Sequence, residues 1–145
     1  MTIVVDSNIF IALSVIDEPF HMQAKQILSL WQSTHTQLIA PHLFKSEVTA
    51  VLRKVVYQNR ITHQQGTLIL QRLLSYPIQF YEDDTLLKRA FELAQIYNRP
   101  RAYDTQYLAL AEQFTCDFWT LDERLFNAVK TQMPFVYWLG NWKKP

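Results

Sequence analysis

Apolar and polar residues follow two kinds of pattern along the chain. Short runs rich in β-branched and aromatic residues predict buried strands, and longer segments with apolar residues every three or four positions predict helices. The expected strands span residues 2–5, 37–40, 78–81, 117–121 and 135–139. The expected helices span about residues 9–16, 19–33, 43–58, 62–74, 83–99, 103–114 and 123–130. Because strands and helices alternate, we expect an α/β fold, with a parallel sheet covered by helices.

The helical spacing also predicts which side chains are buried. Pro19 fits the first turn of its helix, Thr62 is expected to cap another helix, and Gly66 is the one weak point of that helix. The apolar positions expected to face the core are Met22, Ile27, Leu30, Trp31, Phe44, Val48, Val51, Leu52, Val55, Leu68, Leu70, Leu73, Leu74, Leu86, Leu87, Ala90, Phe91, Ala94, Tyr107, Leu108 and Ala111.

Length and composition set further bounds. The 145 residues are 49% hydrophobic, with no visible repeat or linker, which fits one domain over residues 1–145. A net charge of +1 demands neither a nucleic-acid nor a membrane partner. No Lys or Arg precedes Lys25 as a secretory signal would require, and the uncharged stretch 7–16 is about half the ~20 residues of a membrane span. With Cys116 as the single cysteine, we expect a cytoplasmic protein.

Several common catalytic sites are excluded by what the chain lacks. Its two glycines, Gly66 and Gly140, cannot supply a dinucleotide fingerprint or a phosphate loop. The four histidines form no His-Glu-x-x-His pattern, and one cysteine cannot build a thiolate zinc site. The segment Asp6-Ser7-Asn8 lacks the second acid of the Asp-x-Asp loop of haloacid-dehalogenase-like phosphatases, so phosphoaspartate chemistry is a minor option.

Four acids occupy structurally equivalent places in the predicted fold. Asp6 follows the first strand, Asp122 follows the fourth, Asp104 opens the helix before the fourth strand, and Glu47 lies one turn inside the helix after the second. In a parallel sheet all four point toward the carboxyl edge, where ligands bind. Gathered carboxylates raise one another's pKa values unless a cation neutralises them, and hard oxygen ligands select Mg²⁺ or Mn²⁺. We therefore interpret the site as that of a phosphodiesterase.

Each of these residues also has a purely structural interpretation. Asp6 and Asp122 could cap the helices that follow them, Glu47 could be a solvated helix residue, and Asp104 could be a first-turn acid favoured by the helix dipole. Thr120 could be an ordinary strand residue.

The aromatic and basic residues near the motifs are open to two interpretations. The aromatic side chains fit the core or an interface, with base stacking as the alternative. The basic ones could hold substrate phosphates or simply face solvent. The aromatic set is Trp119, Phe135, Tyr137, Trp138 and Trp142, and the basic set is Lys45, Arg99, Arg101 and Arg124.

Four segments together resemble a known family. They are Val5-Asp6-Ser7-Asn8, Ser46-Glu47-Val48, Tyr103-Asp104-Thr105-Gln106-Tyr107-Leu108-Ala109-Leu110-Ala111 and Thr120-Leu121-Asp122-Glu123-Arg124-Leu125-Phe126. Their order and spacing are similar to those of PIN-domain ribonucleases, especially VapC-like toxins of type II toxin–antitoxin systems. The resemblance implies a three-layer α/β/α domain with a central parallel sheet of about five strands. It also implies that Asp6, Glu47, Asp104 and Asp122 are the catalytic, metal-holding acids, with Thr120 and Asn8 or Ser7 as polar support.

The expected activity is hydrolysis of RNA phosphodiester bonds by a water activated by one or two Mg²⁺ or Mn²⁺ ions. We expect an endoribonuclease that is the toxin of a toxin–antitoxin pair, with RNA as substrate, a cognate antitoxin as partner and a homodimer as one possible state. The alternatives are a non-catalytic PIN-like module that binds RNA or acts as a scaffold, and a metal-dependent phosphatase acting on small phosphate esters.

Overall fold

The strands form one parallel sheet of five. The computed structural model describes residues 1–145, and the strand order across the sheet is β3-β2-β1-β4-β5, with every neighbouring pair parallel. This confirms the predicted α/β fold class. The strands are β1 Thr2–Val5, β2 Gln37–Pro41, β3 Ile78–Tyr81, β4 Asp117–Thr120 and β5 Val136–Trp138.

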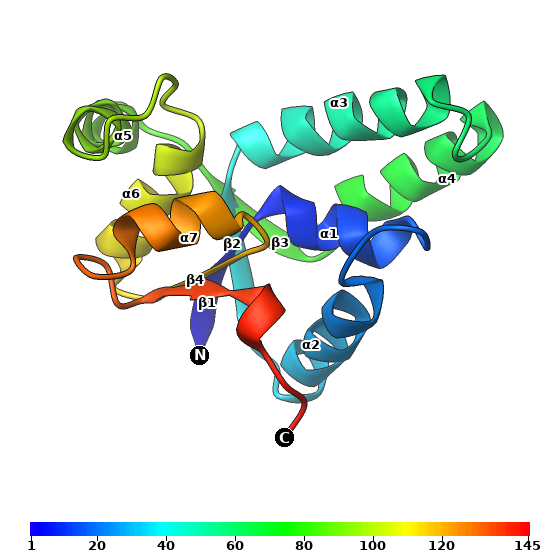
Figure 1. Cartoon of the computed structure of the whole chain (residues 1–145), viewed down its shortest axis with the longest axis horizontal. Helices are drawn as coiled ribbons and strands as arrows, with labels where there is room; N and C mark the ends of the chain where they lie inside the picture. The colour runs from blue at the N-terminus through cyan, green and yellow to red at the C-terminus, as the bar shows by residue number, and fades with distance from the viewer.

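Helices cover both faces of this sheet. In Figure 1, α5 and α6 lie to the left of β1 and β2, α7 lies just above β4, and α1 to α4 lie mostly to the right. No helix is both long enough and apolar enough to cross a bilayer. The helices are α1 Ser7–Ser14, α2 His21–Ser33, α3 Leu43–Tyr57, α4 His63–Leu74, α5 Asp84–Ile96, α6 Asp104–Phe114 and α7 Glu123–Val129, with a short 3₁₀ helix, η1, at Leu139–Asn141.

The helix ends follow local capping chemistry. Thr62 caps α4 as predicted, because its hydroxyl accepts the Gln65 N–H while the Gln65 side chain accepts the Thr62 N–H. The placement of Pro19 in the first turn of α2 was wrong. Phe20 takes a left-handed conformation with φ of 65°, which a right-handed helix cannot include, so α2 begins only at His21.

Several apolar side chains that were expected to be buried face solvent instead. Met22 is 57% exposed and Phe91 is 75% exposed. For Leu68, Leu74, Leu87 and Phe91, the reason is that α4 packs chiefly on α3 and α5 chiefly on α6, so only a narrow stripe of each helix is covered. Met22 and Leu30 lie on α2, which packs chiefly on α1. The incorrectly predicted positions are Met22, Leu30, Val51, Leu68, Leu74, Leu87 and Phe91.

Gly66 contributes to packing rather than only weakening α4. It is buried, and a Cβ at this position would come within 2.8 Å of Val56 Cγ2 on α3. The glycine therefore lets α3 and α4 approach each other closely, at the cost of intrinsic helix propensity.

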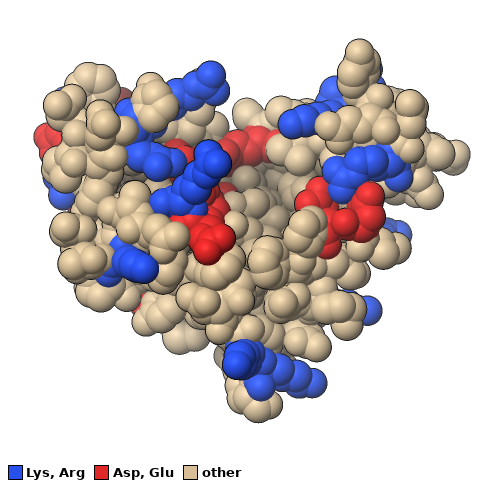
Figure 2. Space-filling view, viewed as in Figure 1, with Lys and Arg blue, Asp and Glu red and all other residues tan.

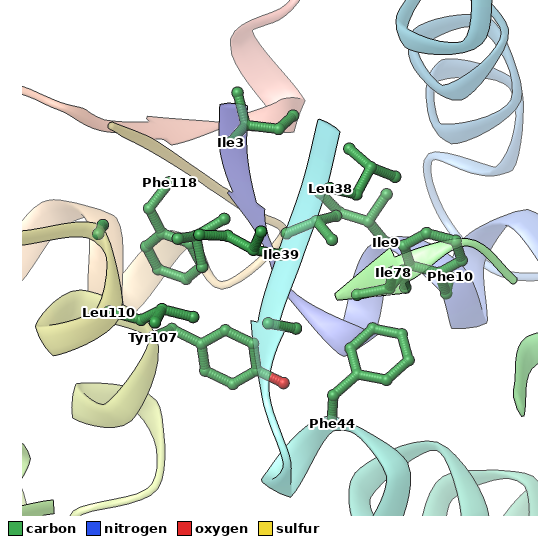
Figure 3. Close-up of a cluster of buried hydrophobic side chains, with 14 of the residues drawn as sticks. Ile3, Ile9, Phe10, Leu38, Ile39, Phe44, Ile78, Tyr107, Leu110 and Phe118 are labelled. Atoms are coloured by element: carbon green, nitrogen blue, oxygen red, sulfur yellow. The ribbon is translucent and has the colours of Figure 1, made fainter. Parts of the chain in front are cut away.

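The central strand β1 lies in the middle of the molecule and ends just before Asp6. Ile3, Val4 and Val5 are fully buried between β2 and β4. Figure 3 shows the core around these strands, with the Tyr107 ring reaching from α6 toward β2. The strand order reverses between β1 and β4, and such switch points open a crevice at the carboxyl edge of a parallel sheet. Asp6, directly after β1, lies at that crevice.

Candidate functional site

A cleft of about 590 Å³ lies at the carboxyl edge of the sheet. It is lined by 14 residues, of which five are acidic and none is Lys, Arg or His. Figure 2 shows the corresponding hollow between the two halves of the molecule, with acidic side chains at its sides. All four predicted acids line this cleft, so the structure brings them together as the parallel sheet required. The acidic lining residues are Asp6, Glu18, Glu47, Asp104 and Asp122.

Asp6 is the most deeply placed of these acids. Its backbone N–H donates to Trp119 O, which extends the β1–β4 ladder by one residue. Its side chain is 7% exposed and makes no cap for α1. Instead, Oδ2 accepts the Thr120 hydroxyl at 2.7 Å and Oδ1 accepts the Ser7 hydroxyl at 3.3 Å. Burial, followed by the nearby charge of Glu47, raises the pKa of Asp6 to about 7.

Thr120 and Asn8 hold the floor of the cleft together. The Thr120 hydroxyl donates to Asp6 and accepts both Asn8 Nδ2, at 3.3 Å, and the Asp122 N–H, at 2.9 Å. Asn8 Oδ1 in turn accepts the Leu121 N–H at 3.0 Å. These bonds tie the start of α1 to the end of β4. Of the residues predicted as polar support, Thr120 bonds to Asp6 directly, and Asn8 is linked to Asp6 through Thr120.

Glu47 reaches the cleft from α3. Its Oε1 accepts the hydroxyl of Ser7, at 3.2 Å, and that of Tyr107. Burial raises the pKa of Glu47, and the hydrogen bonds from Tyr107 and Ser7 partly oppose that rise. Glu47, which the sequence places one turn inside the helix after the second strand, therefore lines the cleft.

Asp104 occupies the first turn of α6. Arg99 Nη2 lies 3.3 Å from Asp104 Oδ2, which is the only ion pair to any of the four predicted acids. Burial raises the pKa of Asp104, the charge of Asp122 adds to that rise, and Arg99 opposes it. The acid is thus partly neutralised from within the chain.

Asp122 has two structural roles. Its Oδ1 accepts the Leu125 N–H at 3.0 Å, so it caps α7, while the residue also lines the cleft. The capping interpretation is therefore correct for Asp122, although Asp6 caps nothing.

The donor set suits a hard divalent cation. Every acidic ligand in the cleft offers carboxylate oxygen, and no histidine or cysteine is present there. Glu47, Asp104 and Asp122 each have one oxygen hydrogen-bonded and the other without a protein partner. No three side chains are already converged as ligands in this conformation. Tyr107 bonds to Glu47, Arg99 to Asp104 and the Leu125 N–H to Asp122, so one oxygen of each of these acids is held by the protein.

Two residues of the site were missed from the sequence: Glu18, which lines the cleft, and Tyr107, which lies behind it. Tyr107 looked like a core residue because of its helical spacing, and nothing local marked its hydroxyl as a donor to Glu47. Glu18 lies in the turn before α2 and pairs with Arg60 at 2.9 Å. No sequence motif distinguishes such a turn residue from a solvated acid.

The aromatic residues near the C-terminus pack against one another and against the helices. Trp119 stacks on Tyr137 with ring centroids 4.9 Å apart, and Trp138 meets Phe20 edge to face at 5.9 Å. This agrees with the interpretation of these residues as core or interface. Of the four basic residues considered, Arg99 contacts a predicted acid, and Lys45 lies over the Phe80 ring.

A five-stranded parallel sheet with acids gathered at its carboxyl edge defines a class, and sequence comparison identifies that class. The model of the PIN domain family matches residues 3–131, and the chain belongs to this family. Over 134 residues it is 30% identical to ribonuclease VapC9 of Mycobacterium tuberculosis and to a VapC ribonuclease of Mycobacterium bovis. Each alignment covers 92% of this chain and 96% of the relative.

Solved structures share the fold. The chain matches Mycobacterium tuberculosis VapC20, described as a Sarcin-Ricin loop cleaving toxin, with a TM-score of 0.67 and 18% identity, over 87% of this chain and 94% of that one. It matches a toxin–antitoxin complex from Klebsiella pneumoniae with a TM-score of 0.63 and 20% identity, over 94% of this chain and 96% of that one. The chain also matches VapBC2 from Rickettsia felis, bound to a DNA fragment from its promoter, with a TM-score of 0.66 and 12% identity. This match covers 95% of this chain and 97% of that one. At these identities the likeness concerns the fold.

Proposed function

We propose that this PIN-domain protein is an endoribonuclease that depends on Mg²⁺ or Mn²⁺ and is the toxin of a toxin–antitoxin pair. The observation that carries the proposal is the cleft at the carboxyl edge of the sheet, which gathers four predicted acids and no basic residue. The 30% identical relatives named as VapC ribonucleases support RNA as the substrate.

Asp6, Glu47, Asp104 and Asp122 would hold the cation. When bound, a divalent ion lowers the pKa of a coordinated water and stabilises the charge that develops on the phosphate. The chain itself supplies position and charge: Thr120 and Ser7 orient the Asp6 carboxylate, which at a pKa of about 7 loses its proton readily near neutral pH. Cation affinity is therefore expected to increase as the pH rises through 7.

The electrostatics of the cleft oppose a scaffold that binds RNA without metal. Five acids and no Lys or Arg line the cleft, and only Glu18 and Asp104 of these acids are paired, with Arg60 and Arg99. An RNA phosphate entering the cleft therefore meets net negative charge, whereas metal-free RNA binding relies on Lys and Arg contacts. Titration with Mn²⁺ separates the two hypotheses, because the thermal midpoint of a metal-binding protein rises with ion concentration and that of a metal-free scaffold does not. Cleavage of RNA beside a small phosphate ester, such as p-nitrophenyl phosphate, separates a nuclease from a phosphatase.

Asp104→Asn tests the nuclease proposal. We expect RNA cleavage in Mn²⁺ to fall at least about 100-fold, since a ligand is lost. The free energy of unfolding without metal should stay level or rise, because the pKa of Asp104 is raised by burial and an amide removes that cost. The matched control is Asp117→Asn at the opposite end of β4, outside the cleft, which should cleave like the wild type. Full activity in purified Asp104→Asn would refute the assignment.

An antitoxin partner follows from the same proposal. The solved structures that share the fold include toxin–antitoxin complexes, and an acidic cleft without cationic lining is suited to accept an Arg side chain from a small protein. The open reading frame of the antitoxin should lie directly beside this one. Its product should inhibit Mn²⁺-dependent cleavage, and the absence of any such neighbour would count against the toxin role while leaving the nuclease role intact. Homodimer formation stays a prediction.

A further inference from the structure

We propose that Tyr107 is a positioning residue that fixes the orientation of Glu47 toward the metal from behind the cleft. This inference rests on the proposed metal-dependent function. It adds a residue that does not itself line the cleft and that the spacing of apolar residues assigns to the core.

Tyr107 is held rigidly in the core beneath the site. Its side chain is 1% exposed, and its ring stacks on Phe118 of β4 with centroids 5.5 Å apart and planes 18° apart. Figure 3 shows the hydroxyl oxygen at the end of the ring nearer Phe44, the side of the cluster formed by α3. The hydroxyl donates to Glu47 Oε1, so a fixed ring in α6 restrains a flexible side chain in α3.

The hydrogen bond from Tyr107 divides the Glu47 carboxylate into two unlike oxygens. Oε1 accepts both Tyr107 and Ser7, and Oε2 has no protein partner. The Ser7 hydroxyl lies 3.2 Å from Glu47 Oε1 and 3.3 Å from Asp6 Oδ1, so the one proton of this hydroxyl lies between the two acids. The network thereby leaves one oxygen of Glu47 available to a cation and sets its direction by the other.

A role limited to the core would not require this arrangement. A buried phenol costs free energy unless its hydroxyl is hydrogen-bonded, and phenylalanine would fill the same space against Phe118 without that requirement. Partners that orient metal ligands in this way typically change metal affinity or activity by about 10- to 100-fold when they are removed. The two roles therefore differ in what the loss of the hydroxyl changes.

The experiment compares Tyr107→Phe, Glu47→Gln and the double variant by isothermal titration with Mn²⁺, together with RNA cleavage. Tyr107→Phe should weaken Mn²⁺ binding about 10-fold, and in the Glu47→Gln background the same substitution should have no further effect. The matched control is Tyr76→Phe, since the ring of Tyr76 packs on Phe10 at 4.8 Å outside the cleft. This control should bind Mn²⁺ and cleave RNA like the wild type.

The outcomes separate this inference from the function on which it rests. If Glu47→Gln weakens Mn²⁺ binding and Tyr107→Phe does not, Tyr107 is only a core residue and the proposed function stands. The same conclusion follows if Tyr107→Phe weakens Mn²⁺ binding by the same factor in the wild-type background and in the Glu47→Gln background. If the wild-type protein takes up no Mn²⁺, both the metal-dependent function and the inference are overturned.

Discussion

Asp6 and Asp122 both precede a helix and follow a strand of the sheet, yet their carboxylates are used differently. Both residues have extended backbone at the position before the helix, with φ and ψ of −75° and 145° for Asp6 and −82° and 95° for Asp122. Asp122 accepts an N–H of its helix, and Asp6 accepts two hydroxyls. The same residue type at the same helix position thus caps a helix as well as lining the cleft in one place, and lines the cleft without capping in the other.

The difference arises from one residue of spacing. Asp6 comes directly after β1, and its N–H still donates to Trp119 O. The sheet therefore keeps Asp6 buried at the carboxyl end of β1. Leu121 separates Asp122 from the end of β4, which places Asp122 beyond the ladder and within reach of the Leu125 N–H. Distance from the strand end therefore decides between burial and capping more clearly than residue type does.

The largest expected effect of this difference is on activity. Asp6→Asn should reduce kcat/KM for RNA cleavage in Mn²⁺ at least about 100-fold. Asp122→Asn should reduce it less, because Asp122 is less buried than Asp6 and water can occupy a ligand position lost there. Steady-state cleavage of the same RNA by both variants provides the measurement, with far-ultraviolet circular dichroism to verify the fold. Equal losses in the two variants would remove the distinction between the two acids.

The second effect is on the pH dependence of stability without metal. The pKa of Asp6 is raised from 3.8 to about 7 by burial, so between these values the folded state binds more protons than the unfolded state. The stabilisation is complete below pH 3.8 and is lost as the pH rises through 7, and each unit of pKa shift corresponds to about 1.4 kcal/mol. Urea unfolding with a chelator should therefore give a lower free energy of unfolding at pH 8 than at pH 5, by a few kcal/mol.

Asp6→Asn should flatten much of this slope, because the amide does not titrate. Glu47 and Asp104 also have raised pKa values, mainly through burial, and they contribute a residual slope of the same sign. An unchanged slope in Asp6→Asn would contradict the assignment of the buried proton to this residue.

The smallest expected effect concerns the cap. Asp122→Ala should lower the free energy of unfolding by about 1 kcal/mol, whereas Asp122→Asn should stay near the wild type, because Asn caps helices as well as Asp does. Chemical denaturation without metal at one pH compares the three proteins. A loss in Asp122→Asn as large as that in Asp122→Ala would show that charge, and not the cap, stabilises this helix end.

The sheet and the positions of the four predicted acids could be predicted from the sequence, because both depend on local periodicity. Alternating strands and helices implied a parallel sheet. Asp6, Asp104 and Asp122 lie at a strand end or a helix start, and Glu47 lies one turn inside α3. Parallel pairing then places their elements along one edge without further information. The proximity of the acids in the fold was therefore predictable, while their metal-holding role stays a prediction.

Other features depend on tertiary geometry that periodicity does not encode. The spacing of Tyr107 places it on a buried face but cannot show that its hydroxyl meets a residue 60 positions away. Phe91 has the same helical spacing as a core residue and faces solvent because no element covers that side of α5. The Arg99–Asp104 pair depends on the path of the loop before α6, which neither motif nor propensity specifies.

Helix α6 carries Asp104 on its first turn and Tyr107 three residues later. Each residue added to a helix rotates the following side chains by about 100°, so one insertion between these positions would turn the phenol away from α3 while leaving Asp104 in place. A change of length in the loop at residues 97–103 would leave the angle between the two side chains untouched. In this protein, natural insertions and deletions are therefore expected before the aspartate and not within the turn that follows it.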